Sequence, residues 1–168
     1  MAAEEAAWNA LRESGAVLVL RHAATVPGTG DPPGFRIDDC STQRNLSAQG
    51  REQAAAIGRS LREQGVSVVR VESSRWCRCL ETARLAFPQL QVQPLAALDS
   101  FFADRAAGPA QTSVLRNRVR DWQGPGVLVL VSHQVNITAL TGQAMAEGEG
   151  VVLRPEADGF RVVGSVRF

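Results

Sequence analysis

The chain has no lysine and no tyrosine, so all 18 of its basic residues are arginines. Without lysine it has neither a Schiff-base nucleophile nor the lysine of a phosphate-binding loop, and without tyrosine it has no phenolic acid catalyst. No Gly-x-Ser-x-Gly motif marks a serine nucleophile. The groups left for nucleophilic or acid–base chemistry are two histidines, three cysteines, the serines and the carboxylates.

The chain also has little net charge and no long apolar segment. A formal charge of +1 with no basic stripe gives no reason to expect a nucleic acid or an anionic membrane as partner. We expect residues 1–168 to form a single domain, since 45% of them are hydrophobic. The first 12 residues lack the basic start and apolar centre of a secretory signal, so a cytoplasmic location is expected, or a periplasmic one if a leader was removed. The sequence does not indicate an oligomeric state.

Two unbroken apolar runs stop on a histidine. Val17–Leu20 is followed by Arg21 and His22, and Val127–Val131 is followed by Ser132 and His133. Runs of this kind are typical of strands buried on both faces. In open parallel α/β sheets, ligands bind beyond the carboxyl ends of such strands, so both histidines are candidates for one site.

The order of elements predicts an α/β fold, a three-layer sandwich with a mostly parallel central sheet and helices on both faces. The irregular stretch Ala24–Leu46, rich in Gly and Pro, is predicted to form a wall beside the site. Ser47 and Ser74 are predicted to cap helices, the second opening at about Arg75. Helices are predicted over residues 2–13, 47–65, from about 75, 111–122 and 135–145, and strands over 17–20, 66–71, 91–94, 127–131, 150–154 and 160–166, the last two as antiparallel edge strands.

Two imidazoles and two arginines, Arg21 and Arg78, are therefore expected at one sheet edge. Arginine binds phosphate oxygens through a rigid fork of donors, which favours a phosphorylated substrate. A neutral His22 can attack phosphorus, and a protonated His133 can stabilise the transferred group. A zinc site is the competing use of these histidines and the cysteines. We expect no metal or cofactor, because Cys77 and Cys79 on one helix would point about 200° apart.

Four motifs, at residues 20–23, 45–54, 73–83 and 131–133, resemble those of the histidine phosphatase superfamily, which has the phosphoglycerate mutase-like fold. The run over residues 39–44 resembles a branch of small bacterial phosphatases. The resemblance implies that His22 is phosphorylated and that Arg21, Arg78 and His133 bind the phosphoryl group. We place Gln134 beside them as a further substrate-binding residue.

The acidic proton donor is the part of the family pattern from which this chain departs, because residues 95–99 have alanine at its place. Asp99, two residues along, is the predicted donor; Asp104, Asp38 and Asp39 are alternatives. Among the cysteines, Cys40 could pair with either Cys77 or Cys79, and only under oxidising conditions.

The predicted function is hydrolysis of a phosphomonoester through a phosphohistidine intermediate on His22, with a small phosphorylated molecule or a phosphoprotein as substrate. Two alternatives stay open at this point. One is a noncatalytic phosphate-binding module of the same fold that lost its proton donor. The other, less favoured because little chain remains for substrate-enclosing insertions, is a phosphomutase.

Overall fold

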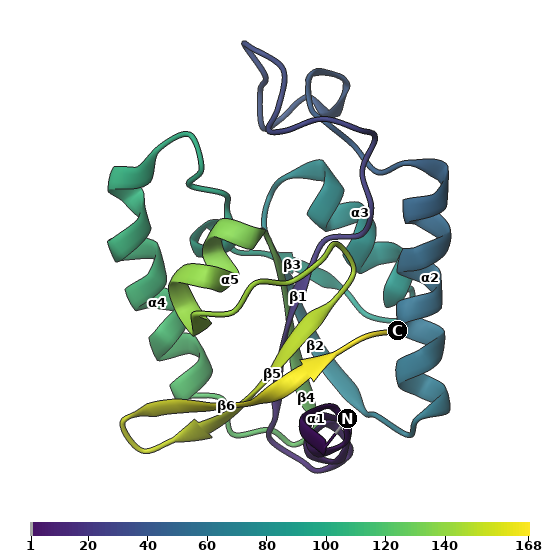
Figure 1. Ribbon diagram of the computed structural model, residues 1–168, viewed down its shortest axis with the longest axis vertical. Coiled ribbons are helices and arrows are strands. Elements are labelled where there is room, and N and C mark those ends of the chain that lie inside the picture. The colour runs from purple at the N-terminus through teal and green to yellow at the C-terminus, as the bar shows by residue number, and fades with distance from the viewer. Residues whose placement is uncertain (1) are drawn as a thin grey trace.

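A computed structural model describes residues 2–168 and shows one six-stranded sheet between two layers of helices (Figure 1). Over these residues no helix has both the length and the apolar composition needed to cross a bilayer. The helices are α1 (Ala2–Arg12), α2 (Ala48–Glu63), α3 (Cys77–Ala86), α4 (Gly108–Arg120) and α5 (Gln134–Thr141), and the strands are β1 (Val17–Arg21), β2 (Val68–Ser73), β3 (Val92–Pro94), β4 (Val127–Ser132), β5 (Gly150–Glu156) and β6 (Gly159–Val166).

The sheet has the order β3-β2-β4-β1-β5-β6, and the four strands on the β3 side are parallel. β1 and β4 are neighbours, with Arg21 opposite Ser132 in the register. Their apolar residues are all buried, as the unbroken runs predict. Because the two strands are parallel and adjacent, the histidines that follow them emerge at the same edge of the sheet.

Helices cover both faces of the sheet. α1, α2 and α3 pack on one face, where Leu18 and Val129 are among the buried strand residues. α4 and α5 pack on the other face, against side chains such as Val19 and Leu130. Alternate residues of β1 and β4 therefore belong to different cores, which is the reason why these strands are apolar throughout.

Several boundaries differ from the sequence prediction. The second strand begins at Val68 instead of Val66, and α3 begins at Cys77, two residues after the predicted start at Arg75. Gly142 ends α5 in the left-handed conformation with φ of 74°, where we expected it inside a longer helix. β5 pairs with both β1 and β6, so the prediction that it is an edge strand is wrong; the predicted antiparallel orientation of these two strands is confirmed.

The segment between β1 and α2, residues 24–46, projects from the sheet edge at the top of Figure 1. Its only regular piece is a short 3-10 turn at Cys40–Thr42. Ser47 caps α2 as predicted, with its hydroxyl accepting a bond from the Gly50 amide. A disulfide between Cys40 and Cys77 joins this segment to the first residue of α3, and Cys79 stays a free, buried thiol.

Candidate active site

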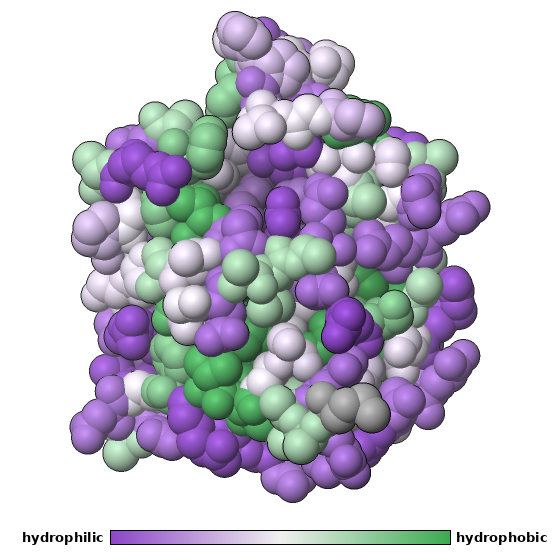
Figure 2. All heavy atoms as spheres, in the orientation of Figure 1, coloured by the Kyte–Doolittle hydropathy of each residue, from purple (hydrophilic) through white to green (hydrophobic). Residues whose placement is uncertain are grey.

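The two histidines lie side by side at the carboxyl edge of the sheet. The centroids of the His22 and His133 rings are 5.6 Å apart, and both residues are almost fully buried. The arginines predicted to join them are there as well: the charges of Arg21 and Arg78 both act on His22. Figure 2 shows that the surface is hollowed beneath the projecting segment and that hydrophilic residues line this hollow. We call this hollow the crevice.

Backbone contacts fix the position and tautomer of His22. Its Nδ1 lies 2.9 Å from the carbonyl oxygen of Ala23, which can only accept, so Nδ1 carries the proton and Nε2 has the free lone pair. The amide of Ala23 donates to Thr82 Oγ1 on α3, and the next amide, of Ala24, donates to Gln53 Oε1 on α2. Two helices thus hold the turn that carries His22.

The electrostatics of the crevice keep both imidazoles neutral. Burial, together with the charges of Arg78, Arg21 and Arg44, lowers the pKa of His22 to about 3. Burial and the charge of Arg78 also lower the pKa of His133 well below its usual value. The predicted protonated form of His133 therefore needs an entering anion, because a negative charge nearby would raise the pKa of this imidazole.

Arg21 and Arg78 each keep part of their hydrogen-bonding capacity unused. Arg21 donates from one terminal nitrogen to the carbonyl oxygen of Met145 at 2.8 Å. Arg78 donates from one terminal nitrogen to Asp31 Oδ1 at 2.9 Å. The Nε–H groups of both arginines are buried and have no partner among residues 2–168. Since buried donors are nearly always paired, both arginines are unusual in keeping donors that no protein group uses.

Asp31 is a crevice residue that the sequence analysis missed. Its side chain is 7% exposed. The carboxylate accepts hydrogen bonds from Trp76 Nε1, from the backbone amide of Arg44 and from the guanidinium group of Arg78. Although burial alone raises the pKa of Asp31, these bonds and the charge of Arg78 hold it below its ordinary value. The sequence offered one hint: Asp31 is an acidic residue in the segment 24–46, which was predicted to lie beside a site that contains arginines.

Glu147, in the loop before β5, was also missed, and no sequence pattern marked it. Its Oε2 accepts a hydrogen bond from Thr25 Oγ1 at 3.0 Å and lies 3.8 Å from His22 Nδ1. Its charge also acts on Arg21 and Arg44. The guanidinium of Arg44 bonds to Gly30 and Thr25 within the projecting segment.

His133 contacts two side chains from the region of β2 and α3, Ser74 and Cys79. Its Nε2 lies 2.8 Å from Ser74 Oγ and 3.5 Å from Cys79 Sγ. Ser74 Oγ also accepts from the amide of Trp76, just before α3, at 3.1 Å. Burial raises the pKa of the Cys79 thiol to about 12, which leaves it protonated and unreactive at neutral pH.

The predicted acid, Asp99, is buried near His133 but is already ion-paired. Its carboxylate accepts bonds from the backbone amide of Arg75 at 2.8 Å and from Arg75 Nε at 2.7 Å, and one oxygen lies 3.4 Å from Ser74 Oγ. Its role as proton donor stays a prediction. Asp104 is exposed, and Asp38 and Asp39 pair with Arg36 on the projecting segment.

Gln134 does not point its polar atoms toward the arginines. Its Oε1 accepts from the amide of Met145 at 2.8 Å and its Nε2 donates to Thr138. Gln134 thereby positions Met145, whose carbonyl oxygen accepts the hydrogen bond from Arg21. Of the cysteines considered as zinc ligands, Cys40 and Cys77 are bonded to each other.

Comparisons with known proteins show the family and the fold of this chain. The family model of the histidine phosphatase superfamily (branch 1) matches residues 17–123, more than half of the chain. A comparison with curated protein sequences gave no match. Among solved structures, the protein histidine phosphatase SixA complexed with tungstate is similar, with a TM-score of 0.65 and 15% identity, covering 90% of this chain and 96% of SixA. A mycobacterial glucosyl-3-phosphoglycerate phosphatase complexed with VO3 has a TM-score of 0.67 and 18% identity, covering 89% and 97%.

Proposed function

Because the chain belongs to the histidine phosphatase superfamily, branch 1, we propose that it hydrolyses phosphomonoesters through a phosphohistidine formed on His22. Nε2 of His22 attacks phosphorus, the bond from phosphorus to the ester oxygen breaks, and the alcohol leaves after taking up a proton. Water then attacks the phosphohistidine, releasing inorganic phosphate and restoring the neutral imidazole. The substrate is a small phosphorylated molecule or a phosphoprotein.

One observation carries this proposal: His22, whose Nδ1 bonds to a carbonyl oxygen and leaves Nε2 free to attack, lies within the field of Arg21 and Arg78, whose buried Nε–H groups have no partner among residues 2–168. The guanidinium groups of Arg21 and Arg78 would hold the phosphoryl oxygens and stabilise their charge in the transition state. The lowered pKa of His22 keeps the nucleophile unprotonated at neutral pH. Tungstate and VO3 in the two similar structures are also oxyanions, which supports an oxyanion site here.

Asp99 stays the proposed proton donor for the departing alcohol. Ser74, whose hydroxyl contacts both Asp99 and His133, links this carboxyl group to the crevice. The carboxylate of Asp99 is already held in an ion pair with Arg75. This pairing is the observation that favours the second candidate function, a phosphate-binding module that performs no hydrolysis.

The His22→Ala variant separates these functions. With an activated aryl phosphate, the wild type should give a burst of acid-labile protein-bound phosphate, and the variant should lose both the label and turnover, by about 10⁴-fold or more. Vanadate binding should be measured on both proteins. Turnover that persists in the variant would contradict the nucleophile, while tight vanadate binding by a wild type that hydrolyses no monoester would favour the binding module.

A further inference from the structure

Trp76 contacts the imidazole ring of His133, which in turn contacts the proposed nucleophile, His22. The indole meets the His133 ring edge to face, with centroids 5.4 Å apart and planes at 79°. Phe35, on the projecting segment, packs against Trp76 with centroids 5.5 Å apart. Neither Trp76 nor Phe35 is fully buried. The two rings thus place partly exposed aromatic surface beside a crevice otherwise dominated by charged and hydrophilic groups.

This aromatic pair is held firmly. Trp76 Nε1 donates to Asp31 Oδ2 at 2.9 Å, and the other oxygen of Asp31 binds Arg78. The disulfide between Cys40 and Cys77 joins the segment that carries Phe35 to the residue directly after Trp76. A surface fixed by such contacts is preorganised for a ligand, because little side-chain entropy is lost on binding.

The same contacts limit what the aromatic pair can bind. The one polar group of the indole, Nε1–H, is already used by Asp31, so Trp76 has no donor for the hydroxyl groups of a sugar. What the pair offers to a ligand is ring faces and edges. Aromatic pairs in stacked or edge-to-face geometry are favoured beyond the apolar area that they bury.

We propose that Trp76 and Phe35 form a leaving-group subsite that accepts a planar, unsaturated ring attached to the phosphate. This inference rests on the proposed function, and it adds the class of substrate: aryl or heteroaryl phosphates. Phosphoryl transfer needs the leaving group roughly in line with the nucleophile, on the side of phosphorus away from His22. The aromatic pair is close enough to meet a group attached to the phosphate, because Trp76 contacts His133 and His133 contacts His22.

Binding of phosphonates, which are not hydrolysed, tests the subsite. Rates of hydrolysis would not do so cleanly, because they depend on the acidity of the leaving group as well as on contacts with its ring. Phenylphosphonate and cyclohexylphosphonate have similar bulk, but only the first has a planar π ring; methylphosphonate measures the anion site alone. We expect calorimetry to show that wild-type protein binds the phenyl compound about threefold to tenfold more tightly than the cyclohexyl compound. Phe35→Leu should bring that ratio near one and leave methylphosphonate affinity unchanged.

Phe168→Leu is the matched control. Phe168 packs edge to face against Trp8 at 5.6 Å, a similar aromatic pair on α1 and the C-terminal segment, far from the projecting segment in Figure 1. This variant should keep the wild-type ratio. Two outcomes would overturn the subsite alone, provided that methylphosphonate binds normally. One is a wild-type affinity for phenylphosphonate that is no higher than that for cyclohexylphosphonate. The other is an affinity ratio that Phe35→Leu leaves unchanged. Failure of all three phosphonates to bind overturns the subsite and the proposed anion site together.

Discussion

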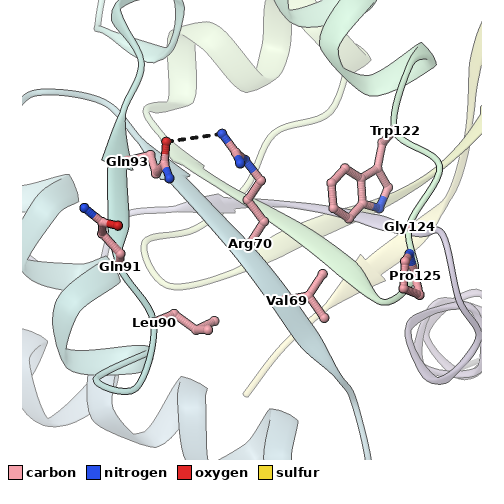
Figure 3. Close-up of a pocket in the computed structure, with 8 residues that line it drawn as sticks. All are labelled: Val69, Arg70, Leu90, Gln91, Gln93, Trp122, Gly124 and Pro125. Atoms are coloured by element: carbon pink, nitrogen blue, oxygen red, sulfur yellow. Dashed lines mark hydrogen bonds between the residues drawn. The ribbon is translucent and has the colours of Figure 1, made fainter.

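The molecule has two contrasting arginine clusters. One lies in the crevice and contains Arg21 and Arg78; the other lies near the β2–β3 edge of the sheet and contains Arg70 and Arg118. In the second, Glu72 on β2 is 5% exposed and accepts bonds from Arg70 Nε at 2.6 Å and from Arg118 Nε at 2.9 Å. Figure 3 shows the groove beside it, where Arg70 also donates to Gln93. Both Nε–H groups are paired there, whereas both are unpartnered in the crevice.

The difference separates an ion pair that stabilises the fold from a group of charges arranged for a ligand. Around Glu72, one carboxylate satisfies two guanidinium groups, and nothing more is needed. In the crevice, Asp31 satisfies one terminal nitrogen of Arg78 and leaves its Nε–H free. Buried hydrogen-bonding capacity that the protein does not use is costly to folding, and ligand-binding sites are where such a cost is retained.

The largest expected contrast between the clusters is in catalysis. Arg21→Met should lower kcat/KM for an aryl phosphate by about 10²–10³-fold, because it removes donors from the charged transition state. Its free energy of unfolding should change by only about 1 kcal/mol, for the lost bond to Met145. Arg118→Met is the matched control and should keep kcat/KM. Equal losses of kcat/KM in the two variants would break the comparison.

Acid should destabilise the crevice before it affects the Glu72 cluster. The pKa of His22 is near 3 in the folded protein and about 6.5 when unfolded, so its contribution is complete above pH 6.5 and is lost progressively as the pH falls toward 3. Between pH 6.5 and 4.5 the wild type should lose about 2 kcal/mol more stability than His22→Gln. Urea unfolding at several pH values measures this difference. Parallel losses would mean that folding does not lower the pKa of His22.

The sequence was sufficient to predict the parts of the crevice that depend on short-range patterns and on parallel topology. Two apolar runs located β1 and β4, and their direction brought His22 and His133 to one edge. Ser47 as the cap of α2 was equally local, and it is confirmed. Such features depend on hydrophobic periodicity and capping, which a single sequence contains.

The contacts made by loops could not be predicted in the same way. Asp31 reaches Arg78 across 47 positions of the chain, through a segment without regular structure. The choice of Cys77 over Cys79 as partner of Cys40 depended on where α3 begins. With its first residue at Cys77, that residue faces the projecting segment and Cys79 lies against His133. These outcomes are decided by tertiary packing, which local propensity does not encode.

The smallest expected effect concerns the Glu72 cluster itself. Glu72→Gln keeps the size of the side chain but removes the charge that two arginines share, and it should lower the free energy of unfolding by about 2 kcal/mol at pH 7. Hydrogen bonds from Arg118 and Arg70 lower the pKa of Glu72 although burial opposes them, so its stabilisation is present at neutral pH and declines only in strong acid. The difference in stability between wild type and variant should therefore shrink as the pH falls below 4.5, and kcat/KM should be equal at pH 7. A variant that also loses activity would show that this saturated cluster, and not only the crevice, takes part in catalysis.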